Sequence, residues 1–175
     1  MKIATVLAVA VFAAVLIACG PQGTESTETA VQQMLSKPEL TEKVLAAYEH
    51  LRAQLASDKV ASAGDFESLA EAARAASAAF SGEAKGHLEQ LASAAESVDP
   101  GVAEGLDQVR EAFGEVSQHL IALLSADPDL ARGRYVFECP MAKSYPKWVQ
   151  QSETVSNPYL GPEMATCGVV SAWQP

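Results

Sequence analysis

The sequence lacks the patterns that usually identify an enzyme. It contains no Gly-x-Ser-x-Gly, His-Glu-x-x-His, Walker or dinucleotide-binding motif. Glu115 and His119 stand four residues apart, which is not the Glu-x-x-His spacing of di-iron helical bundles. The sequence therefore predicts a protein that is not an enzyme.

Positive charge is also scarce. The chain has 12 lysines and arginines against 22 acidic residues, a formal net charge of −10. This acidity argues against nucleic acid as a partner, because phosphate backbones are bound by lysine and arginine. It is compatible with a protein that attracts cations.

The apolar run at the N-terminus is short. Ile3 to Ile17 is too short for a confident membrane span but suits the hydrophobic region of a secretory signal. It ends in Leu16-Ile17-Ala18-Cys19, which resembles the lipobox of bacterial lipoproteins, where the cysteine is lipidated after cleavage. An ordinary signal peptide or anchor helix with an incidental cysteine is the alternative.

We therefore expect residues 1–18 to be a lipoprotein signal peptide and Cys19 to carry the lipid. Cleavage would remove Lys2 and no acidic residue, so the net charge of −10 would become −11. The mature protein would be membrane-anchored in the bacterial cell envelope, facing the periplasm or the cell exterior. Residues 19–37 then form the lipidated cysteine and a flexible tether, because Gly20 to Thr29 contains no large apolar residue.

Alanine and leucine dominate residues 38–125, with few β-branched runs, and predict an all-α fold, an up-and-down four-helix bundle. Four segments carry apolar residues three and four positions apart: one from about Pro38 to Leu55, one capped by Asp58 or Asp65 that reaches Phe80, one from Ser81 to Val98, and one that starts at Asp99-Pro100 and reaches Leu124.

Residues 126–175 form a different kind of segment. Its prolines and glycines exclude a long helix, while Tyr135-Val136-Phe137 and Val169-Val170 predict short strands. We expect an irregular C-terminal tail, rich in Cys and Met, that packs on the bundle over the end containing Ser81 and Ser125.

This tail holds two pairs of sulfur ligands. Cys139 and Met141 are two residues apart, and Met164 and Cys167 are three apart. Two thiols and two thioethers favour a soft metal ion, above all Cu(I), whereas a cysteine-only zinc site would leave both methionines unexplained. The sequence thus predicts a copper-binding site made of these four residues.

Several other residues are candidates for a supporting role at this site. His119 and His87 are the helical candidates for an additional ligand, because both are predicted near the end of the bundle from which the tail leaves. Trp148, Asn157 and Tyr159 are candidates for the surroundings of the metal, by shielding it or by shaping the turn that delivers Met164 and Cys167. Each also has a purely structural explanation.

A disulfide is the competing interpretation. With Cys19 acylated, Cys139 and Cys167 are the remaining two thiols in an oxidising compartment. A Cys139–Cys167 disulfide would close the tail into a loop and stabilise it by roughly 3 to 4 kcal/mol. The protein would then be a stapled helical lipoprotein that serves as a protein-interaction module.

The tail also resembles a known family. Cys139-Pro140-Met141, Trp148-Val149-Gln150 and the segment from Asn157-Pro158-Tyr159 to Cys167-Gly168 are similar to motifs of a family of secreted domains of unknown function, found alone or beside CusB-type copper and silver efflux adaptors. The resemblance covers roughly residues 40–170. It implies a role in copper handling or efflux, with a copper efflux or delivery protein as a partner.

Overall fold

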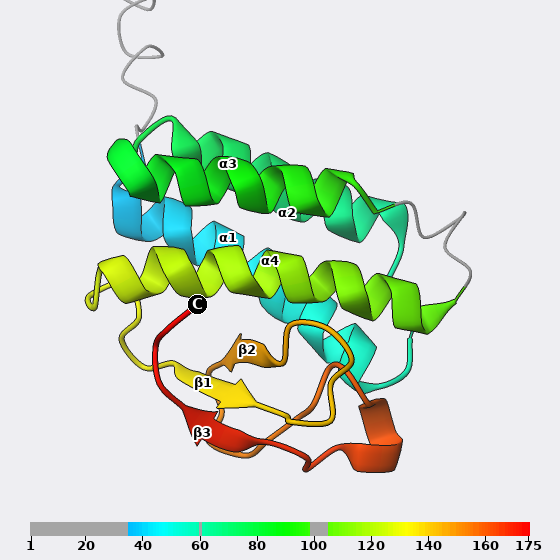
Figure 1. Cartoon of the computed structure of the whole chain (residues 1–175). Coiled ribbons are helices and arrows are strands. Elements are labelled where there is room, and N and C mark those ends of the chain that lie inside the picture. Colours follow the sequence, from blue (N-terminus) through cyan, green and yellow to red (C-terminus); the bar gives the residue numbers. More distant parts are fainter. Residues whose placement is uncertain (1–34, 60, 99–104) are drawn as a thin grey trace, which may run out of the picture. The chain divides into compact units, whose positions relative to one another are not determined.

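The helices and strands follow the order in which they were expected along the chain. The computed structural model describes residues 35–59, 61–98 and 105–175 (Figure 1). Within these residues Leu35–Pro175 form one compact unit. Its elements are α1 (Lys37–Ala56), α2 (Ala63–Ser77), α3 (Gly82–Glu96), α4 (Leu106–Ala126), β1 (Tyr135–Glu138), β2 (Lys147–Gln150), the 3-10 helix η1 (Gly161–Met164) and β3 (Val169–Ser171).

The first two helices begin at serine caps. The carboxylate of Glu39 accepts the backbone N–H of Ser36 at 2.7 Å, and Asp65 does the same for Ser62 at 2.7 Å. Ser62 is therefore the N-cap of α2, and neither aspartate predicted for that place occupies it. Asp58 instead adopts a positive φ of 54° and pairs with Arg110.

The fourth helix begins later than predicted. Its first residue is Leu106, preceded by Gly105 with a φ of 144°. Glycine is favoured there because this backbone conformation is strained for residues with a Cβ. The predicted start, Asp99-Pro100, lies outside the described residues.

The helices pack in sequence order around an apolar core. α1 contacts α2, α2 contacts α3, and α3 contacts α4, while α4 also contacts β2 on another side (Figure 1). The apolar stripes predicted for the helices supply most of the buried side chains, including Leu51, Leu69, Leu91 and Leu120. A mostly helical fold with a small C-terminal sheet is thus confirmed.

The tail forms a three-stranded antiparallel sheet in the order β2-β1-β3. Val136 of β1 lies opposite Val149 of β2 and Ser171 of β3. The strands predicted at 135–137 and 169–170 are confirmed, whereas β2 was not predicted as a strand. Because β1 is the central strand, the segments around residues 139 and 167 become neighbours.

The sheet does not cover the predicted end of the bundle. The hydroxyl of Tyr48, in the middle of α1, accepts the backbone N–H of Val149 at 3.2 Å. Arg110, near the start of α4, donates to the carbonyl of Pro158 at 2.9 Å, whereas Ser125 lies at the other end of that helix. The sheet therefore lies along α1 and α4 rather than over the end with Ser81 and Ser125, where the sequence places the tail, although Trp173 lines a pocket with Leu124 and Ser125.

The predictions for the N-terminus concern residues that the structure does not describe. The proposed signal peptide at 1–18, Cys19 and the tether up to residue 34 are among the residues that the structure does not describe. None of the helices in residues 35–59, 61–98 and 105–175 combines the length and the apolar character needed to cross a membrane.

Candidate metal-binding site

The two thiols of the tail lie beside each other because of the strand order. Cys139 directly follows β1, and Cys167 stands two residues before β3. Glu138 pairs with Val169 in the antiparallel register, so the chain brings Cys139 next to the Cys167-Gly168 segment. Both cysteines are free thiols. The sequence prediction that these residues converge is thus consistent with the pairing of the strands.

The environments of the two thiols differ. Cys139 is completely buried, and its backbone N–H donates to the carbonyl of Pro146 at 3.0 Å. Cys167 is half-buried. Hydrogen bonding to Cys139, followed by burial and the charge of that neighbour, raises the pKa of the Cys167 thiol. A cation placed between the two thiols would favour their thiolate forms.

Each methionine shares a turn with one of these cysteines. Ala142, the residue after Met141, donates its N–H to the carbonyl of Cys139 at 3.1 Å. Met164 ends η1, and its carbonyl accepts the N–H of Cys167 at 2.9 Å. The side chains of Met141 and Met164 are 58% and 37% exposed. Each turn that carries a cysteine thus also carries a solvent-exposed methionine.

Asn157 fixes the position of the Cys167 turn. This asparagine is fully buried, and its amide nitrogen donates to the carbonyl of Cys167 at 2.7 Å. Its own N–H donates to the carbonyl of Ala165 at 3.0 Å, and its side-chain oxygen accepts the N–H of Tyr159 at 2.7 Å. Asn157 therefore acts on Cys167 through the backbone, as a positioning residue.

The aromatic neighbours anchor the tail. Trp148 is fully buried, stacks on Phe137 with ring centroids 5.7 Å apart and meets Tyr159 edge-on at 5.9 Å. A Cβ on Gly168 would lie 2.7 Å from the tip of the Trp148 ring, so only glycine fits beside it. The hydroxyl of Tyr159 donates to the carbonyl of Lys147 at 2.6 Å. These contacts hold the cysteine-bearing turns against the sheet.

The two candidate histidines lie elsewhere. The rings of His87 in α3 and His119 in α4 face each other, with centroids 6.3 Å apart. Two residues along a helix correspond to about 200° around its axis, so His119 faces away from Ser117, which bonds Tyr48 beneath the sheet. The structure therefore does not bring His87 or His119 to the sulfur atoms.

The donor set predicted for the site consists of sulfur. In the part of the chain that the structure describes, no group of three or more histidine, cysteine, aspartate or glutamate side chains is placed to hold a metal ion. The thioethers of Met141 and Met164, in the turns next to the two cysteines, are the further donors that the sequence predicts. Such a set fits a soft monovalent ion better than Zn(II), which prefers four thiolate, imidazole or carboxylate ligands.

Two arginines for which the sequence predicts no such role hold the tail on the helices. Arg110 donates to the carbonyls of Pro158 and Leu55 and to Asp58, and Arg52 donates to the carbonyl of Ser156 at 2.7 Å. Both side chains are almost buried. A cationic residue in the middle of a helix usually indicates a solvated surface, so the sequence offers no signal for these roles.

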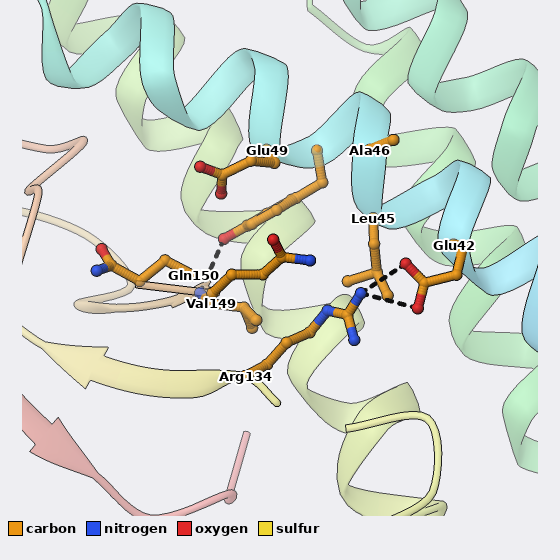
Figure 2. Close-up of a pocket in the computed structure, with 9 residues that line it drawn as sticks. Glu42, Leu45, Ala46, Glu49, Arg134, Val149 and Gln150 are labelled. Carbon is orange, nitrogen blue, oxygen red and sulfur yellow. Dashed lines mark hydrogen bonds and ion pairs between the residues drawn. The ribbon is translucent and has the colours of Figure 1, made fainter. Parts of the chain in front are cut away.

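A cleft lies between α1 and the sheet, and the charged side chains that line it already form ion pairs within the protein. Figure 2 shows Arg134 pointing toward Glu42, with which it forms two hydrogen bonds of 2.7 and 2.9 Å. The cleft has a volume of about 320 Å³ and is also lined by Glu49, which is bound to Arg52. The Arg134–Glu42 pair joins the start of the tail to α1, and the Glu49–Arg52 pair lies within α1, so the charges of the cleft are neutralised inside the fold and the thiol pair remains the better candidate site.

Comparison of the chain with models of protein families, with curated proteins and with solved structures found no match.

Proposed function

We propose that this protein is a lipoprotein of the bacterial cell envelope that binds one Cu(I) ion through Cys139, Cys167, Met141 and Met164. The observation that carries the proposal is the pair of adjacent thiols, each with a methionine in its own turn. The role would be copper handling or efflux, and we propose no catalytic activity. A copper efflux or delivery protein would be the partner, as the resemblance of the tail implies.

The chemistry of the four residues supports a soft monovalent ion. Thiolates supply charge as well as bonds, while thioethers bind Cu(I) without losing a proton. The buried thiol of Cys139 would form the inner wall of the site, and the exposed methionines would close its outer side. Copper could therefore enter and leave on the solvent side without opening the helical core.

The proposed site would lie on one flank of the helices. We infer that α1 to α4 form an up-and-down bundle, because successive helices contact each other and are joined by short connections. The sheet packs on α4 and carries the sulfur atoms. The lipid on Cys19 would hold this whole unit at a membrane surface, through the tether at 19–37.

The second candidate function is the stapled interaction module. The same adjacency of Cys139 and Cys167 that suits a metal also suits a disulfide. A disulfide would join β1 to the segment before β3 and would leave Met141 and Met164 as surface residues. The two candidates differ in what the reduced protein binds.

A competition assay on the full-length protein in detergent separates them. Reduced protein should take one equivalent of Cu(I) from a bidentate chelator, and Cys139→Ser or Cys167→Ser should abolish that uptake. Met141→Leu and Met164→Leu should weaken it by less, with the fold unchanged because leucine conserves the volume of methionine. Cys19→Ser is the matched control, since it changes a cysteine outside the site. Failure of the reduced protein to compete would reject copper binding in favour of the disulfide.

A further inference from the structure

The two thiols differ in access to solvent, and this asymmetry has a chemical consequence. Cys139 is 0% exposed, whereas Cys167 is half-buried and lies two residues before Val169, whose side chain is 65% exposed. Thiol–disulfide exchange requires one sulfur to reach another in line with the bond that breaks. An external disulfide therefore reaches Cys167 in the native fold but not Cys139.

The geometry also allows the two thiols to join. Glu138 and Val169 are direct partners in the antiparallel register, so Cys139, just after the first, and Cys167, two residues before the second, lie in neighbouring segments. Cys167 belongs to a turn closed by its own N–H on the carbonyl of Met164, and its side chain bonds that of Cys139. Two thiols in such contact can be joined by a disulfide with little movement of the backbone.

The backbone around both cysteines is fixed in advance. The N–H of Cys139 is bonded to Pro146, and the carbonyl of Cys167 is bonded to the buried amide of Asn157. Closing the bond therefore orders little additional chain. A sulfur attached to Cys167 has the Cys139 thiol as its immediate neighbour.

We infer that Cys167 is the site at which an external low-molecular-weight disulfide reacts with this protein, and that Cys139 is the resolving thiol. In the first step the Cys167 thiolate attacks the disulfide RSSR, which forms a Cys167–S–S–R bond and releases one RS⁻. In the second step the Cys139 thiolate attacks the Cys167 sulfur, which forms the Cys139–Cys167 bond and releases the second RS⁻. The protein loses two electrons and two protons in total, and RSSR is reduced to two RSH.

This reaction sets the state of the sulfur site, a conclusion that rests on the proposed function. A disulfide leaves neither thiolate free, so copper retention and oxidation exclude each other. The exposed member of the pair would then control whether the site is available.

Metal-free full-length protein carrying Cys19→Ser, treated with glutathione disulfide, tests the inference by mass spectrometry. With both tail cysteines present, the product should be the internal disulfide, and samples quenched early should carry glutathione on the Cys167 peptide. Cys139→Ser should accumulate a stable glutathione adduct, whereas Cys167→Ser should react at least about tenfold more slowly, because Cys139 must first be exposed by local opening.

Early adducts on the Cys139 peptide, or equal rates for the two serine variants, would overturn the inference. The early samples do not depend on the stability of any tail variant. Since no copper is present, a failure here leaves copper binding intact, and a failure of copper binding leaves this result unchanged.

Discussion

At the scale of single residues, Tyr48 joins the helices to the sheet. Its buried hydroxyl bonds Ser117 at 2.8 Å and accepts the backbone N–H of Val149 at 3.2 Å, and its ring stacks on Phe113 with centroids 4.9 Å apart. Burial raises the pKa of this hydroxyl above its ordinary range, so it stays protonated. The sequence shows Tyr48 as one member of an apolar stripe and gives no sign of its polar contacts.

Replacing Tyr48 with phenylalanine should destabilise the protein. The change leaves the Ser117 hydroxyl and the Val149 N–H buried without this partner, which costs about 1 to 3 kcal/mol. Urea unfolding measures the effect. Tyr135→Phe is the control, because that hydroxyl bonds Glu153 at an exposed site and its loss should matter little. Equal midpoints for Tyr48→Phe and the unmodified protein would contradict the assignment.

His119 should make stability depend on pH. Burial, and then electrostatic repulsion from His87, lower the pKa of His119, while Glu115 opposes them. The unfolded chain therefore binds a proton more readily, and the free energy of unfolding falls as the pH drops through and below about 6.5. Unfolding at pH 7.5 and pH 5 should show a smaller acid-induced loss for His119→Gln. His50→Gln should keep the loss, and equal losses for all three proteins would refute the role of His119.

At the scale of elements, local signals predict the helices well and the tail only in part. The apolar stripes and capping residues are contained within each helix, so their positions follow from nearby residues. The sheet depends on contacts such as Arg110 with Pro158, 48 residues apart. The sequence does not predict β2, because Lys147 and Gln150 flank only two apolar residues and make the segment look polar. Gln150 is nevertheless buried, and its side-chain oxygen accepts the indole N–H of Trp148.

For the proposed sulfur site, too, the features that depend on nearby residues were predicted and those that depend on distant contacts were not. Its four residues were predicted from spacing and chemistry within short motifs, and the structure brings the two cysteines together. The histidines were placed by an assumed position of the tail, over the wrong end of the helices. His119 lies on a face of α4 that points away from the sheet. Which face of α4 packs against α1 and β2 is set by contacts between elements distant in the sequence, so the sequence alone does not predict it.

Asn157→Ala tests whether the turn before β3 positions Cys167. The alanine lacks the amide that bonds the Cys167 carbonyl, so the turn should loosen while the helices remain. Copper affinity should fall roughly 10- to 100-fold, as for other residues that orient ligands. Competition for Cu(I) and circular dichroism measure the two effects. Gln151→Ala, at a nearby exposed position, should change neither. Unaltered affinity in Asn157→Ala would show that the turn is held by other contacts.

At the scale of the whole molecule, charge and apolar surface are distributed unevenly. Residues 35–125 contain 15 acidic and 7 basic residues, a net charge of −8, whereas residues 126–175 contain 5 and 4, a net charge of −1. The large apolar side chains recorded as exposed in the described residues all lie in the tail: Met141, Met164, Val169 and Val170. The helical part thus presents a solvated acidic surface, and the tail presents the surface that carries the proposed site.

Cys19→Ala tests the proposed membrane attachment. Alanine cannot be acylated, so the protein should leave the membrane fraction or remain unprocessed, with the mass of the signal peptide retained. Fractionation and intact mass measure both outcomes. Cys139→Ser is the matched control, since it removes a thiol of the tail and should leave the attachment unchanged. Identical fractionation and mass for Cys19→Ala and the unmodified protein would refute lipidation at this residue.

The central claim is that sulfur alone holds copper in this protein. X-ray absorption spectroscopy of the reduced, copper-loaded, full-length protein measures the element and distance of the atoms around the metal. We predict Cu(I) with a first shell of sulfur only, which loses part of its sulfur signal in Met141→Leu and Met164→Leu and keeps it in Cys19→Ser. A shell dominated by nitrogen or oxygen, or copper that does not stay with the protein through desalting, would contradict the account.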